Sequence, residues 1–249
     1  MVVNYSAVPR ESLRGRLLRL PLALIPRGMV VPILQGPCKG MRWVVGSSTH
    51  GCWLGSYESE KMQCFVASVR PRQVVYDIGA NAGIYTLAAS RLVGSAGRVV
   101  AVEPLPRNLA FLRRHVQMNH CANVTILPVA VSDENGTALF DDDTDASQGH
   151  LSANERLEVT VARLDDVAKV EKLPPPDVIK MDVEGAEAKV LAGGERIISQ
   201  SRPIIFLATH GAQVKQECLR WLRGHGYTVE SLLGSDAEYA YEFIAQVRG

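Results

Sequence analysis

From Pro71 onward, short runs of β-forming residues alternate with segments that have helical spacing. The runs read as strands are residues 74–78, 98–102, 124–131, 177–181 and 203–208, and helical spacing follows in 84–92 and 106–119. Strands that alternate with helices of this length indicate βαβ units and a parallel sheet with helices on both faces. We therefore predict an α/β fold with a Rossmann-like, mostly parallel sheet.

The end of the chain departs from this alternation. Residues 218–223 have helical spacing, and residues 227–232 and 241–247 read as two strands joined by a polar turn at 234–236. Two strands in direct succession pair antiparallel when a short turn joins them. We expect a β-hairpin to close the sheet at its C-terminal end.

Two further segments do not fit the alternation. Residues 1–70 form an N-terminal extension, which we expect to pack on the main domain, residues 71–249, rather than fold alone. Within it, residues 12–25 have the pattern of an amphipathic helix, which more often covers a core than contacts a membrane surface. Residues 133–173 form a polar insertion in which Leu157, Val159 and Val161 alternate like a strand.

Composition excludes several classes of protein. The chain is 47% hydrophobic and 21% charged with a formal net charge of +1, so it is neither a disordered chain nor a strongly basic nucleic-acid binder. Its five cysteines form no C-x-x-C pair, which argues against a disulfide framework or a zinc ribbon and for reduced thiols in the cytoplasm. Arginines and prolines interrupt the most apolar stretch, residues 17–34, so we predict no membrane span.

The first expected strand ends in the loop Asp77-Ile-Gly79-Ala-Asn81-Ala-Gly83. Ligands of open α/β sheets sit beyond the carboxyl ends of the strands, next to the first strand. Gly79 allows a sharp turn and a close ligand, Gly83 allows the next helix to pack closely, and a helix N-terminus offers free N–H groups to an anion. The glycine spacing is not G-x-G-x-x-G, so a dinucleotide oxidoreductase is a weaker interpretation.

Two acids near this loop indicate the kind of ligand. Asp77 precedes the first glycine by two positions, where it would repel a pyrophosphate and attract a cationic amine or sulfonium. Glu103 ends the second strand, and a carboxylate there accepts hydrogen bonds from both hydroxyls of a ribose. The pattern favours a nucleoside that carries a positive charge and no pyrophosphate.

Several spaced segments stand out, which are Asp77-Ile-Gly-Ala-Asn-Ala-Gly83, Val102-Glu103-Pro104, Ile179-Lys-Met-Asp182-Val-Glu184-Gly-Ala-Glu187, Trp53-Leu-Gly-Ser-Tyr57-Glu58 and Arg163-Leu-Asp-Asp166. Together they resemble the FkbM family of S-adenosylmethionine-dependent methyltransferases. The match covers residues 38–232. One departure stands out, because many family members carry Glu-x-His after the fifth strand, where this chain has Ala208-Thr209-His210. A catalytic role for that glutamate does not carry over.

The resemblance implies a class I methyltransferase fold, S-adenosylmethionine as cofactor and S-adenosylhomocysteine as product. It implies that the loop holds the methionine part, that Glu103 takes the ribose, that adenine rests beside the end of the third strand, and that part of the N-terminal extension covers the cofactor. The cofactor-binding residues would be Asp77, Gly79, Asn81, Gly83, Glu103, Val131, Ser132, Tyr57 and Glu58.

Methyl transfer to an alcohol needs alignment for in-line displacement and a base for the hydroxyl proton. Asp182 and His210 end the fourth and fifth strands and can reach one crevice, and Glu184 follows closely, so these three are the predicted catalytic residues. His150 in the insertion is a weaker candidate. Glu187 begins a helix, where an acid stabilises the helix dipole.

The acids also bear on metal binding. Asp182, Glu184 and the run from Asp141 to Asp145 leave Mg²⁺ open as an option, but a solvated acidic loop explains such a run more often. We predict no metal site.

The sequence therefore predicts an O-methyltransferase for a small-molecule hydroxyl, on a sugar or a polyketide-type natural product. The insertion 133–173 is expected to form one wall of the acceptor site. Alternatives are an RNA or other nucleic-acid methyltransferase, suggested by the basic extension, and a catalytically inactive scaffold that binds the cofactor. The sequence leaves the oligomeric state open, a homodimer being one option.

Overall fold

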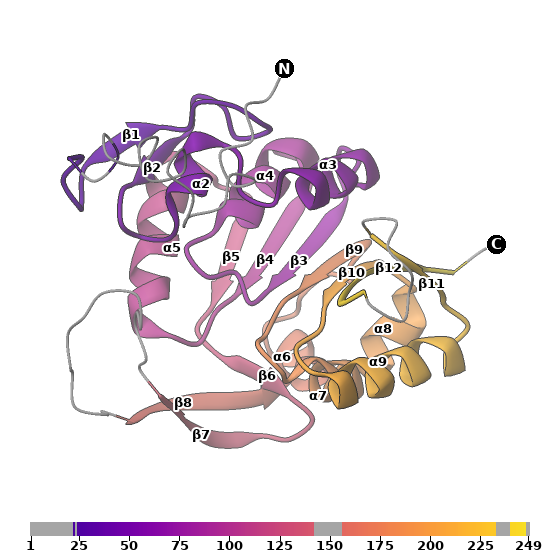
Figure 1. The fold of residues 1–249 in the computed structure, drawn as a ribbon. Helices are drawn as coiled ribbons and strands as arrows, with labels where there is room; N and C mark the ends of the chain where they lie inside the picture. Colours follow the sequence, from indigo (N-terminus) through magenta and orange to yellow (C-terminus); the bar gives the residue numbers. More distant parts are fainter. Residues whose placement is uncertain (1–21, 23, 142–155, 233–239, 248–249) are drawn as a thin grey trace.

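A computed structural model describes residues 22, 24–141, 156–232 and 240–247 (Figure 1). Within them, a central sheet of seven strands has the order β11-β12-β10-β9-β3-β4-β5. The strands are β3 (Val74–Ile78), β4 (Arg98–Val102), β5 (Val124–Leu127), β9 (Val178–Met181), β10 (Ile204–Ala208), β11 (Thr228–Ser231) and β12 (Glu242–Gln246). Neighbours from β5 to β10 pair parallel, whereas β12 pairs antiparallel with both β10 and β11. The predicted parallel sheet with a closing hairpin is confirmed.

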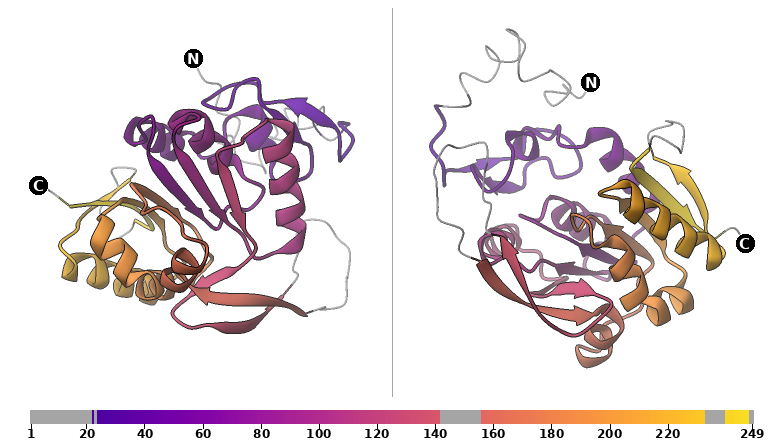
Figure 2. Two further views of the ribbon diagram at one scale, coloured as in Figure 1. Left: turned by 180° about the vertical axis from the view of Figure 1, so that it is seen from behind. Right: turned by 60° about the horizontal axis from the view of Figure 1, so that its bottom comes forward.

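Helices cover both faces of this sheet. On one face, α3 (Ser59–Ser68), α4 (Ile84–Val93) and α5 (Pro106–Met118) pack, and on the other face α6 (Leu164–Val170), α7 (Glu187–Gly193), α8 (Glu195–Ser201) and α9 (Ala212–Gly224) (Figure 2). Strand residues alternate between the faces, so that Val75 joins the first layer and Tyr76 the second. Residues of β4 from Val99 to Val102 are at most 1% exposed, as expected for a parallel strand buried on both sides.

The expected strand 124–131 is wrong in its extent. β5 ends at Leu127, and Ala130–Ser132 form a separate strand, β6, in a side sheet with the order β6-β8-β7. Pro128 explains the break, because it has no backbone N–H to donate to a neighbouring strand. The side sheet lies at the edge of the molecule in both views of Figure 2.

The insertion 133–173 supplies most of this side sheet. It holds β7 (Gly136–Asp141), β8 (Arg156–Arg163) and α6, and β8 contains the alternating run predicted as a strand. β6 pairs parallel with β8, and β7 pairs antiparallel with it. His150, Asp142–Asp145 and the proposed turn at 234–236 lie outside the described residues, as does most of the proposed helix 12–25.

The described part of the N-terminal segment contains β1 (Val30–Pro32), β2 (Arg42–Val44), α2 (His50–Leu54) and α3. Its side chains Trp43 and Phe65 are fully buried in one cluster with Leu87 and Ala88 of α4. This segment therefore shares a core with the first helical layer of the main domain. Among the described residues, no helix has the length and apolar character needed to cross a membrane.

Candidate functional site

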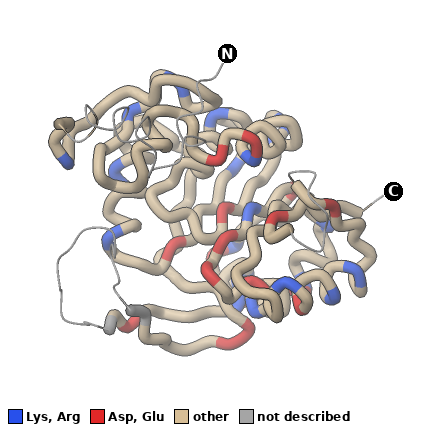
Figure 3. Tube along the Cα trace, viewed as in Figure 1, with Lys and Arg blue, Asp and Glu red and all other residues tan. Residues whose placement is uncertain are grey.

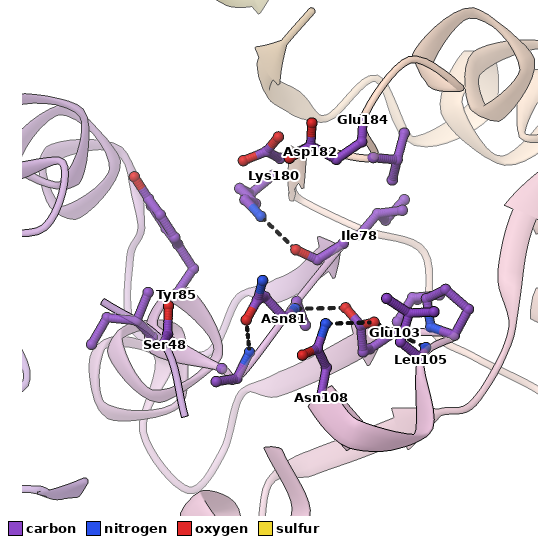
Figure 4. A pocket seen from close by; sticks show the side chains of 18 of the residues that line it. Ser48, Ile78, Asn81, Tyr85, Glu103, Leu105, Asn108, Lys180, Asp182 and Glu184 are labelled. Atoms are coloured by element: carbon purple, nitrogen blue, oxygen red, sulfur yellow. Dashed lines mark hydrogen bonds between the residues drawn. The ribbon is translucent and has the colours of Figure 1, made fainter. Parts of the chain in front are cut away.

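A cavity of about 280 Å³ opens at the carboxyl ends of β3, β4 and β9 (Figure 4). Its wall includes the loop from Gly79 to Gly83, Glu103, Lys180 and Asp182. The N-terminal segment adds further wall residues, which are Trp43, Ser48, Cys52 and Tyr57. In Figure 3 several acidic positions lie in the centre of the molecule with basic positions beside them, and further positions of both kinds lie around the outside.

Two glycines shape the loop after β3, and both have positive φ. At Gly79 φ is +78°, and a Cβ would lie 1.8 Å from the backbone oxygen of Asp182. At Gly83 φ is +96°, and a Cβ would lie 2.5 Å from Cδ1 of Leu112. A side chain at either position would collide with packed neighbours. The glycines thus let the loop lie against the end of β9 and against α5.

Asp77 does not line the cavity. Its side chain is fully buried, where Oδ2 accepts a hydrogen bond of 2.6 Å from Thr86 and Oδ1 lies 3.4 Å from Nζ of Lys180. Lys180 does line the cavity, and its Nζ donates a hydrogen bond of 2.8 Å to the backbone oxygen of Gly79. Sequence reasoning gave Asp77 the ligand contact and missed Lys180, although a lysine within the apolar run of β9 is a signal that could have found it.

Glu103 holds the loop in place while it faces the cavity. Its carboxylate accepts hydrogen bonds from the backbone N–H of Asn81 (2.7 Å) and of Leu105 (3.0 Å) and from Nδ2 of Asn108 (3.3 Å) (Figure 4). Burial raises the pKa of Glu103, and these hydrogen bonds oppose that effect. A carboxylate offers about four acceptor positions, so one remains for a ligand.

Of the two residues expected to contact adenine, Val131 borders the cavity and Ser132 does not. Val131 lines the cavity next to Val129 and Ala130, and this apolar stretch suits the face of an aromatic ring. Ser132 is buried and is not part of the wall, and its hydroxyl lies 3.0 Å from Oδ1 of Asp133.

Tyr57 and Glu58 also occupy different places. Tyr57 lines the cavity, and burial raises the pKa of its hydroxyl. Glu58 lies instead at a small neighbouring cavity of about 30 Å³, where it accepts a hydrogen bond of 2.9 Å from Tyr85 and pairs with Lys61 at 2.9 Å.

The three predicted catalytic residues lie together. Asp182 and Glu184 line the cavity, and Nε2 of His210 is 3.7 Å from Oδ1 of Asp182 and 3.3 Å from Oε2 of Glu184. On its other side, Nδ1 of His210 is 2.8 Å from Oε1 of Glu187. Desolvation by itself lowers the pKa of His210, but the Glu187 hydrogen bond and the charges of Glu184, Glu187 and Asp182 outweigh it and raise this pKa.

These side chains meet the geometric condition for a metal site. The ligand atoms of Asp182, Glu184 and His210 all lie within 4.8 Å of one another. A protonated His210 lies within ion-pair distance of both carboxylates and offsets one of their two negative charges. Acidic groups often gather in this way without a metal ion, so the geometry alone does not demand one.

Residues 77–229 match the family model described as "Methyltransferase FkbM domain". The chain is similar to 31-O-demethyl-FK506 methyltransferase FkbM of Streptomyces tacrolimicus, with 30% identity over 65% of this chain and 75% of that protein. It is also similar to 2-O-methyltransferase NoeI of Sinorhizobium fredii, with 31% identity over 53% of this chain. The match spans 62% of NoeI and 56% of a third relative, hexuronic acid methyltransferase AglP of Haloferax volcanii, which is 25% identical over 55% of this chain.

A solved structure has the same fold. It is the structure of methyltransferase FkbM from Methylobacillus flagellatus, with a TM-score of 0.51 and 17% identity over 80% of this chain and 55% of that one. At this identity the similarity concerns the fold alone.

Proposed function

Because this chain belongs to the FkbM methyltransferase family, whose cofactor is S-adenosylmethionine, we propose that it methylates a hydroxyl group of a small molecule. The observation that carries the proposal is that two groups of residues line one cavity (Figure 4). One group is Glu103 with its neighbours Leu105 and Asn108, and the other is Asp182 with Glu184. The first part has the chemistry of a nucleoside site. The second has the chemistry needed to bind and deprotonate an alcohol.

The side chains of the cavity fit the cofactor. Glu103 has one acceptor position left, which suits one ribose hydroxyl, and the apolar residues Val129 and Val131 suit the adenine ring. At the methionine end, Asn81 and the cation of Lys180 suit a carboxylate, and the carbonyl groups of the loop suit an amino group. In this proposal Asp77, Gly79 and Gly83 act by building the loop, and Asp77 acts by holding Lys180.

Bound S-adenosylmethionine supplies an activated methyl group on a sulfonium centre. The chain has to align the acceptor with it and remove the hydroxyl proton. We assign binding of the acceptor hydroxyl to the carboxylates of Asp182 and Glu184, which line the cavity. His210 then accepts the proton, since its Nε2 lies beside both carboxylates.

Two segments complete the proposed site. The N-terminal segment 1–70 covers the cofactor, which is supported by Trp43 and Tyr57 in the cavity wall. We keep the acceptor-wall role of the insertion 133–173 as a proposal that awaits a test, since none of its described residues borders the cavity. All five cysteines are free, which fits the reducing cytoplasm that we propose as the protein's compartment.

The names of the relatives suggest the acceptor class. They refer to a demethylated FK506, to a 2-O position and to a hexuronic acid. We therefore propose a sugar or a polyketide-type compound as the acceptor of this chain.

A transfer assay with radiolabelled S-adenosylmethionine tests the proposal. The panel should contain glycosides, uronic acids, macrolides that carry free hydroxyls, and structured RNA. We expect transfer to a small hydroxylated compound that falls by about 100-fold or more in His210→Gln, the usual contribution of a general base. Transfer to RNA alone, or bound cofactor with no transfer to any compound, would contradict the acceptor class.

A further inference from the structure

Glu187 carries a buried carboxylate that accepts hydrogen bonds from a few nearby N–H groups. It is the first residue of α7, and its side chain is 0% exposed. Its Oε1 faces Nδ1 of His210 at 2.8 Å and accepts hydrogen bonds from the backbone N–H of Gly185 at 3.0 Å and of Val183 at 3.4 Å. One oxygen therefore ties together the turn after β9 and the histidine after β10.

The helix-dipole interpretation does not account for this placement. An acid can stabilise a helix start from an exposed or partly buried position, whereas burying a carboxylate completely is costly unless donors compensate for it. The second oxygen, Oε2, is buried and has no hydrogen-bond partner among the described residues. A buried group that remains partly unsatisfied calls for a reason other than packing.

The contact at Nδ1 decides which ring nitrogen of His210 can accept a proton. A carboxylate accepts and never donates, so the proton of a neutral imidazole stays on Nδ1 and the lone pair is on Nε2. Nε2 is the atom beside Asp182 and Glu184, the two acids that line the cavity. The geometry thus aims the basic nitrogen at the place proposed for the acceptor.

We propose that Glu187 is the positioning residue of a Glu187–His210 pair, in which it fixes the imidazole so that Nε2 receives the proton of the acceptor hydroxyl. The inference rests on the function proposed above. The O–H bond of the acceptor breaks and its proton goes to Nε2. The oxygen forms the new bond to the methyl carbon, and the electron pair of the broken S–C bond stays on sulfur.

The charges around His210 support this pairing. The charged groups that face it are Glu187 from α7, Glu184 from the preceding turn and Asp182 from the end of β9. Together they favour the imidazolium that forms when Nε2 takes up a proton, so the pKa of His210 lies above its ordinary value. In the role of positioning residue, Glu187 both orients the ring and stabilises its protonated form.

The test compares Glu187→Gln with a matched control on the full chain. The control is Glu195→Gln, because Glu195 pairs with His225 at 3.4 Å in an exposed position. The first measurement is the NMR titration of the His210 ring nitrogens without cofactor. We expect the Nδ1–H tautomer in the unmodified protein, and in Glu187→Gln a lower pKa and a mixture of tautomers. Glu195→Gln should leave the His210 signals unchanged.

The second measurement is the pH dependence of kcat. Activity requires neutral His210, so it falls as the pH drops below the pKa of this residue. Glu187→Gln should move this acid limb to lower pH and lower the plateau kcat by at least about tenfold, a part of the roughly 100- to 10,000-fold that a general base contributes. KM for S-adenosylmethionine should stay within about twofold, because the proton transfer is not part of cofactor binding.

A double variant separates this inference from the proposed function. If Glu187 acts through His210, Glu187→Gln should have no further effect on kcat in a His210→Gln background. If His210→Gln keeps full kcat, the proposed base is wrong, and the NMR titration still tests the pair by itself. Should Glu187→Gln fail to fold, Glu187→Asp, which keeps the carboxylate, is titrated in its place. It should retain the Nδ1–H tautomer.

Three outcomes would overturn the pair. One is a His210 tautomer and pKa that do not change in Glu187→Gln. Another is a loss of thermal stability in that variant with kcat and its pH profile intact. The third is an activity that requires added Mg²⁺ and disappears with a chelator, since the three side chains would then act as metal ligands.

Discussion

Glu103 combines two roles that a single carboxylate can fill because it has several lone pairs. Three donors from Asn81, Leu105 and Asn108 fix it, and it still borders the cavity. The loop after β3 and the start of α5 are therefore both tied to the residue that we expect to bind the ribose. Any change at this position should alter the site before it alters the fold.

We expect Glu103→Gln to weaken binding of S-adenosylhomocysteine by about 10- to 100-fold. Hydrogen bonds to a charged group contribute about 1.5–3 kcal/mol, and a glutamine amide also turns a donor toward buried N–H groups. Isothermal titration calorimetry measures the dissociation constant, and Glu134→Gln on the exposed surface is the control. A dissociation constant within twofold of the unmodified protein would exclude Glu103 from the ribose site.

The role of a residue in the site can be predicted from its sequence position in some cases and not in others. Glu103 was found because it ends a strand at a fixed distance from the glycine loop. Asp77 belongs to the glycine loop motif itself, yet its side chain is buried against Thr86 and Lys180. Sequence position indicates which strand end a residue occupies, but neighbours that are distant in the chain decide which way its side chain turns.

At the level of elements, a histidine joins the N-terminal segment to the main domain. The His115 ring of α5 stacks on Trp43 of β2 with 3.9 Å between ring centroids. Its Nδ1 donates to the backbone oxygen of Ala82 at 2.7 Å, and its Nε2 accepts from the backbone N–H of Val44 at 2.9 Å. β2 is thereby attached both to α5 and to the loop that borders the cavity.

This contact requires a neutral ring, which predicts a pH-dependent stability. Burial lowers the pKa of His115 to about 4, and the Ala82 hydrogen bond only partly opposes it. The unfolded chain, with an ordinary pKa of about 6.5, then binds the proton first as the pH falls. The contribution is complete above pH ~6.5 and is lost as the pH drops toward about 4, a change of about 3 kcal/mol.

Urea unfolding at several pH values between 7 and 4 checks this prediction. His115→Gln should show a smaller decrease in the free energy of unfolding over this range than the unmodified protein does. His120→Asn serves as the control, because His120 is exposed and asparagine tolerates its positive φ of 54°. An equal decrease in His115→Gln and in the unmodified protein would show that His115 is not the group responsible.

The elements were predicted with uneven success for identifiable reasons. The strands β3, β4, β9 and β10 are apolar runs rich in β-branched residues and buried on both faces. Such runs can be recognised as strands from the sequence. The third strand was drawn too long because the apolar run continues across Pro128. Whether β6 continues one sheet or joins another depends on β8, which lies about 30 residues further along the chain.

At the level of the whole molecule, the cavity draws on both the N-terminal segment and the main domain. Trp43 and Tyr57 from the first meet Glu103 and Asp182 from the second. A ligand that binds there stabilises the folded chain as a whole, because the unfolded chain has no such site.

We therefore expect S-adenosylhomocysteine to raise the melting temperature. At about 100 times its dissociation constant it adds about 2.7 kcal/mol to the free energy of unfolding, which corresponds to about 5–10 °C for a domain of this size. Differential scanning calorimetry with and without the ligand measures the shift, and NAD is the control. An equal shift with NAD would contradict a site that is specific for this cofactor.

The α/β class, the mostly parallel sheet, the closing hairpin and the strand ends at which Glu103, Asp182 and His210 lie were all predictable from the sequence. These features follow from local patterns, namely hydrophobic periodicity, the spacing of glycines and the acids that end two strands. Tertiary structure alone decided that Asp77 turns inward to Lys180, that Ser132 stays outside the cavity wall, and that Glu187 reaches His210 across 23 positions of the chain. The physical reason is that burial and hydrogen bonding depend on which elements pack together, and a local pattern does not contain that information.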